Sequence, residues 1–60
     1  MRWYMATTDG DFENEYGKFH SDEEAISEFL EWQEGEDFSI LEIYECANDE
    51  TLTPTRLIWH

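Results

Sequence analysis

The stretch of sequence that decides the fold spans residues 21–37: SDEEAISEFLEWQEGED. Ser21 and Glu24 form a capping box, in which the Ser21 hydroxyl accepts a backbone N–H and the Glu24 side chain reaches back toward the cap. The apolar residues that follow recur at helical spacing: Ala25, Ile26, Phe29 and Leu30. Gly35 tolerates the left-handed backbone that often ends a helix. The pattern predicts a helix over residues 22–34.

The chain before this helix has strand character. Residues 2–8 alternate in polarity and are rich in aromatic and β-favouring side chains. Asp9-Gly10 is a strong signal for a short hairpin, which leads into a second predicted strand over residues 12–19.

The chain after the helix also has strand character. Residues 38–46 (FSILEIYEC) carry Ile40 and Tyr44 on one expected face and Leu41 and Ile43 on the other. Because both faces are apolar, the segment is predicted to be a central strand, or a strand with one face covered by a partner.

A last short strand is expected over residues 55–59. The order ββαββ predicts an α+β fold: a small antiparallel sheet with one acidic amphipathic helix packed across it, in a single domain over residues 1–60. The expected core comprises residues of the helix and the third strand: Ile26, Phe29, Leu30, Leu41 and Ile43.

The composition is strongly acidic, with 16 Asp and Glu against three Lys and Arg and a net charge of −13. Such charge often accompanies disorder, but ten aromatic residues and 40% hydrophobic residues favour a folded chain. The charge also disfavours binding to nucleic acid or an anionic membrane and favours a basic protein partner. The basic residues are too far apart in sequence to neutralise several phosphates; Arg2 and Arg56 are expected to form local ion pairs.

Several acids are predicted to share one helix face. Glu24, Glu28 and Glu31 fall on a stripe opposite the apolar arc, and with Glu34 they place carboxylates about 4–6 Å apart along the axis. One DNA strand carries a charge every ~3.4 Å. The predicted partner-binding residues are this stripe with the acids at its ends: Asp22, Glu24, Glu28, Glu31, Glu34, Glu36 and Asp37. An ordinary solvated face is the alternative, although such a face usually interleaves Lys or Arg.

A second candidate patch lies in the hairpin and comprises Asp11, Glu13 and Glu15. A calcium loop starting at Asp9 would need Gly and Glu at positions that hold Asn14 and His20, so no metal site is expected there. No catalytic residue and no cofactor site is expected either.

The single Cys46 is most simply a small buried residue, whose pKa nearby carboxylates would raise. The lone cysteine suggests a reducing compartment, and no secretory signal or membrane span is apparent, so we expect a cytoplasmic protein (in the host cytoplasm if it is viral). At about 60 residues the core is thin, and a homodimer is one route to further burial.

In general character the chain resembles small, very acidic phage-encoded inhibitors, including DNA-mimic anti-restriction proteins, uracil-DNA glycosylase inhibitors and anti-CRISPR proteins. The resemblance rests on the capped Glu-rich helix (SDEEAISEFLEWQEGED) between aromatic strands. It implies a non-enzymatic inhibitor that blocks the basic nucleic-acid-binding cleft of a host nuclease or defence complex. The alternatives are an acidic protein-binding adaptor or regulator (antitoxin-like or polymerase-binding) without mimicry, and a protein whose acidity serves solubility alone.

Overall fold

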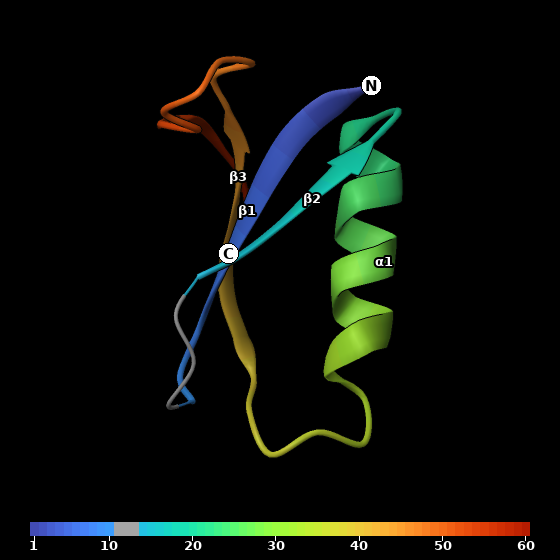
Figure 1. Ribbon diagram of the computed structural model, residues 1–60. Coiled ribbons are helices and arrows are strands. Elements are labelled where there is room, and N and C mark those ends of the chain that lie inside the picture. Colours follow the sequence, from blue (N-terminus) through green and yellow to red (C-terminus); the bar gives the residue numbers. More distant parts are fainter. Residues whose placement is uncertain (11–13) are drawn as a thin grey trace.

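The computed structural model in Figure 1 describes residues 1–10 and 14–60. Its elements are, in chain order, β1 (Arg2–Thr8), β2 (Glu15–Phe19), α1 (Asp22–Gln33), β3 (Ile40–Cys46) and β4 (Pro54–Trp59). The strands form one antiparallel sheet in the order β2-β1-β3-β4. The helix α1 lies along one face of this sheet (Figure 1). The predicted α+β fold is confirmed, and β3 is a central strand.

The N-terminal cap of α1 forms at Ser21, and of the predicted capping box the structure shows the Ser21 half. The Ser21 Oγ accepts the Glu24 backbone N–H at 3.1 Å, which satisfies one of the free donors of the first turn. The helix ends at Gln33, one residue earlier than predicted, and Gly35 follows with φ +79°. A side chain at Gly35 would strain this left-handed backbone, which explains why glycine ends the helix.

The turn signal Asp9-Gly10 does not form a two-residue hairpin. The register of β1 with β2 places Ala6 opposite Glu15, two residues beyond the partner that such a turn would give. Asp9 is engaged elsewhere: its Oδ1 accepts the Ser39 N–H at 2.7 Å, and its own N–H donates to the Ser39 carbonyl at 3.1 Å. Asp9 therefore fixes the connection between α1 and β3.

The predicted faces of β3 are wrong at Ile40 and Leu41. The pairing of β1 with β3 skips Leu41, which is the extra residue of a β-bulge. The bulge brings Ile40 and Ile43 to the same core, while Leu41 is 49% exposed. Leu41 therefore does not belong to the core, because an inserted residue breaks the period of two on which the prediction rested.

The core lies between α1 and the sheet. It contains residues from the helix, β1, β3 and the segment before β3: Tyr4, Ala6, Ala25, Phe29, Phe38, Ile40 and Ile43. Ile26 and Leu30 are partly buried against this cluster.

Among residues 1–10 and 14–60, no helix lies over the other side of the sheet (Figure 1). Directly opposed residues of antiparallel strands share a face, so the register defines its members. We call it the open sheet face; it comprises Trp3, Met5, Thr7, Tyr16, Lys18, Glu42, Tyr44 and Leu57.

Candidate functional site

Six of the predicted helix acids lie on α1 and on the residues that follow it, and together they make up a candidate surface. We call it the acidic helix surface: Glu24, Glu28, Glu31, Glu34, Glu36 and Asp37. All of these residues are exposed except Glu24, which is partly buried. The last turn of α1 contains no basic residue, so the carboxylates there add to the negative end of the helix dipole.

The two arginines lie away from this surface. Arg56 Nη2 contacts Asp22 Oδ2 and Glu45 Oε1, each at 2.7 Å, and Arg2 Nη1 lies 3.7 Å from Glu45 Oε2. The expected ion pairs of Arg2 and Arg56 are thus confirmed. Both are made at the N-terminal end of α1, and among residues 1–10 and 14–60 no ion pair reaches the acidic helix surface.

Lys18 is the third basic residue, and it lies on the open sheet face. Its Nζ is 5.1 Å from the centre of the Trp3 ring, a cation–π contact. Lys18 therefore sits on the opposite side of the sheet from α1.

Asp22 differs from the other predicted helix acids. It accepts hydrogen bonds from Arg56 and from the Tyr4 hydroxyl, the latter at 2.8 Å. The hydrogen bond from Arg56 has the largest effect and that from Tyr4 the next, and both hold the pKa of Asp22 below its ordinary value. Burial, together with the same carboxylate, raises the pKa of Tyr4 to about 12. Asp22 therefore joins the start of α1 to the sheet and is already neutralised within the chain.

The predicted hairpin patch is only partly described. Asp11 and Glu13 lie outside the described residues, as do the first two residues of the strand predicted from residue 12; β2 begins at Glu15. Glu15 pairs with Ala6 on the face that carries α1, and it is partly buried. The sequence analysis expected Glu15 on a solvent-facing side of the strand, and the structure places it on the side of the helix.

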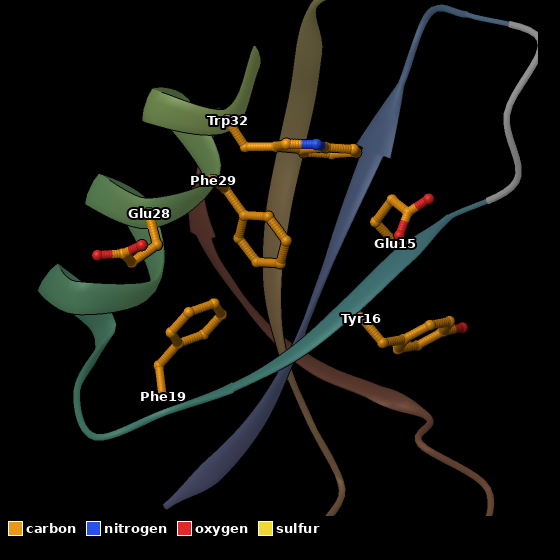
Figure 2. A pocket seen from close by; sticks show the side chains of 6 residues that line it. All are labelled: Glu15, Tyr16, Phe19, Glu28, Phe29 and Trp32. Carbon is orange, nitrogen blue, oxygen red and sulfur yellow. The ribbon is translucent and has the colours of Figure 1, made fainter. Parts of the chain in front are cut away.

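A pocket of about 250 Å³ lies between β2 and α1 (Figure 2). It is lined by Glu15, Tyr16, Phe19, Glu28, Phe29 and Trp32. Figure 2 shows Trp32 reaching from α1 toward the strands, with Glu15 and Glu28 on opposite walls and Tyr16 directed away from α1. The pocket brings Glu28 of the acidic helix surface together with Glu15 of the hairpin patch.

Gly17 helps to shape this pocket. It lies on the face of α1, between Glu15 and Phe19, and the Phe19 ring occupies the space above it. A Cβ at Gly17 would lie 2.7 Å from Phe19 Cε2. The ring also packs edge-on against Phe29, with centroids 5.4 Å apart. Sequence reasoning missed the pocket, because its walls come from residues that only the fold brings together.

Other chemistry has less support in the described residues. Within residues 1–10 and 14–60, no group of three or more His, Cys, Asp or Glu side chains is placed to hold a metal ion. Nor does that part of the chain contain a helix with the length and apolar character to cross a membrane. Cys46 is buried, and burial followed by the charge of Glu45 raises the pKa of its thiol, which disfavours the nucleophilic thiolate.

The protein presents a row of carboxylates on a helix whose start is tied to the sheet, with an aromatic pocket beside the row. Comparison of the chain with protein-family models, with curated proteins and with solved structures finds no match.

Proposed function

We propose that this protein is a non-enzymatic inhibitor that binds the basic, nucleic-acid-binding cleft of a host protein through the acidic helix surface. The carboxylates take the place of phosphates, and DNA or RNA is thereby excluded. The resemblance to phage-encoded inhibitors makes a defence nuclease of the host, in the cytoplasm, the first class of target to examine.

The observation that carries this proposal is the separation of the acids from the bases. Six carboxylates line α1 and the residues after it, while Arg2 and Arg56 pair with Asp22 and Glu45 at the start of the helix. Leaving like charges unpaired four residues apart slightly destabilises a helix. A cleft lined with Lys and Arg would relieve this repulsion and would release the counterions that both surfaces hold.

The structure also favours one part of the predicted surface over another. Asp22, at the start of α1, is neutralised by Arg56, whereas Glu31, Glu34 and Glu36 follow toward the end of the helix without an ion pair in the described residues. We therefore centre the proposed contact on the second half of α1 and the residues that follow it.

The experiment is capture with competition. The protein is immobilised and exposed to a nuclease-treated lysate of the cells in which it occurs, and bound proteins are eluted with duplex DNA, with RNA or with a neutral polymer. We expect nucleic-acid-binding proteins to be released by DNA or RNA, and their affinity to fall steeply with salt. Elution that is equal for the neutral polymer would contradict mimicry.

A second candidate function is supported by the open sheet face. Tyr16 is 44% exposed and Leu57 is 43% exposed, and both lie in the cross-strand row that runs over Met5 and Tyr44. An adaptor or regulator could bind a partner through this row without mimicry. Such a partner would resist elution by nucleic acid and by moderate salt, so the same experiment separates the two functions.

A further inference from the structure

The pocket between β2 and α1 has the size of a side-chain site. Its volume of about 250 Å³ lies below the ~300–1,000 Å³ of pockets that hold drug-sized ligands. One wall is β2, which carries Glu15, and the other is α1, which carries Glu28 (Figure 2). In Figure 2 the Glu28 carboxylate points away from β2, toward the outer side of α1.

The lining of the pocket selects for a cation with an apolar stem. Phe19, Phe29 and Trp32 supply aromatic rings, and Trp32 remains 37% exposed. The faces of such rings attract cations. No ion pair in the described residues involves Glu15 or Glu28, so their charges are free to meet a ligand. An anion would be repelled by the two carboxylates, and an uncharged apolar group would gain nothing from their charge.

We propose that this pocket binds one arginine side chain of the partner protein. An arginine combines three features that suit this lining: an alkyl stem that packs on apolar side chains, a flat guanidinium that stacks on aromatic rings, and a fork of donors that can bind the Glu15 carboxylate. Glu28 adds negative charge on the helix side of the pocket. A lysine ammonium has the charge but not the flat surface, so it binds more weakly here. The inference rests on the proposed function only in naming a basic protein as the source of the arginine.

The position of the pocket gives this arginine a role beyond charge. Glu28 belongs both to the pocket and to the acidic helix surface, so an arginine held there lies next to the row of carboxylates. A row of like charges attracts a basic cleft at any of several registers, whereas a pocket accepts one side chain in one place. The buried arginine thus fixes the register of the complex, as buried anchor residues do at other interfaces.

The test uses small probes and needs no knowledge of the target. Nα-acetyl-arginine amide is titrated into the ¹⁵N-labelled protein, and the indole N–H signals of Trp3, Trp32 and Trp59 are followed by NMR. Nα-acetyl-citrulline amide, of the same shape but uncharged, and Nα-acetyl-lysine amide are titrated in parallel. We expect a saturable shift of Trp32 with arginine, a weaker one with lysine, and none with citrulline.

Matched variants then test whether arginine binding needs the two pocket carboxylates in particular. Glu15→Gln with Glu28→Gln removes both pocket carboxylates, and Glu23→Gln with Glu50→Gln removes two exposed carboxylates elsewhere. We expect the first pair to weaken arginine binding about tenfold and the second to change it less than about twofold.

Three outcomes would overturn the proposal. They are equal binding of arginine and citrulline, equal shifts of all three indoles, and equal weakening by the two pairs of variants. Each would show that the probe meets the general negative charge or an apolar surface and not this pocket. The proposed function would survive such a failure if nucleic acid still displaced captured partners, and it would fall independently if it did not.

Discussion

The acidic helix surface and the open sheet face handle charge in opposite ways. On the open sheet face, Lys18 lies over the Trp3 ring and Glu42 hydrogen-bonds Tyr44, whose pKa it raises. Each of these charges is engaged by a neighbour on its own face. The acidic helix surface carries six carboxylates, and among the described residues none of them forms an ion pair.

The difference shows that the acidity of this chain is not spread evenly. Solubility alone would be served by acids mixed with bases on every side of the molecule. Here the aromatic, nearly neutral side and the acidic side are separated by a single thin core. They would bind partners of different kinds, and the predictions below aim to separate their contributions, beginning with the core on which both depend.

The largest expected effect comes from Ile43→Ala, because Ile43 is fully buried beneath both surfaces. We expect it to lower the free energy of unfolding by about 2–5 kcal/mol, measured by urea denaturation. Leu41→Ala, two residues away but exposed by the bulge, is the matched control and should cost no more than about 0.5 kcal/mol. Equal costs would mean that the bulge does not place Leu41 outside the core.

Charge reversal separates the two surfaces directly. Glu28→Lys with Glu31→Lys should leave the fold intact, since both side chains are exposed. The affinity for a partner identified by capture should fall about a hundredfold, because the new lysines face the basic residues of the partner. Leu57→Ser on the open sheet face, outside the pocket, should change affinity less than about threefold.

The control for total charge is Glu23→Lys with Glu50→Lys, which alters the net charge by the same four units at other exposed positions. We expect a loss well below that of the helix pair, measured by surface plasmon resonance against the same partner. A reversed ranking, with the sheet variant losing most, would favour the adaptor.

Gly17→Ala tests the border between β2 and α1. The new Cβ would approach Phe19 Cε2 to 2.7 Å, so the ring must shift against Phe29, at an expected cost of about 1 kcal/mol. The same shift should move the Trp32 indole signal, because the ring lines the pocket. Adding Phe19→Leu should restore much of the lost stability. A stabilising Gly17→Ala with an unchanged indole signal would contradict the packing described here.

The smallest effect concerns the pairing of Asp22. Because Arg56 and Tyr4 lower its pKa in the folded state, Asp22 contributes stability above its unfolded pKa, and this contribution is lost as pH falls through the folded value. The difference in melting temperature between wild type and Asp22→Asn should therefore be constant near neutral pH and should shrink as pH falls through the folded-state pKa of Asp22. We expect it to correspond to about 1 kcal/mol or less. A difference that grows on acidification would contradict the assignment.

Local signals predicted the fold well where neighbours in sequence decide the structure. Ser21, Glu24 and Gly35 marked both ends of α1 to within one residue, and the apolar character of β3 marked a central strand. The prediction failed at Leu41, because a bulge depends on how β1 and β3 align and not on β3 alone.

The candidate site was predictable only in part for the same reason. The exposure of Glu28 and Glu31 followed from helical periodicity. The ion pair of Asp22 with Arg56 joins residues 34 positions apart, and the pocket depends on the Phe19 ring lying over Gly17 and against α1. Neither the ion pair nor the pocket can be predicted from the local sequence pattern.

The position of Arg2 and Arg56 at the N-terminal end of α1 has a consequence for the rate of association. Positive side chains gather at the start of the helix, while unpaired carboxylates and the negative end of the helix dipole lie toward its other end. The protein therefore carries an electric moment along α1 as well as a net charge. The electric field of a basic partner would therefore orient the protein before contact, with the C-terminal end of α1 toward the partner. Fast, salt-sensitive association would follow, while the lifetime of the complex would depend on the contacts made after arrival.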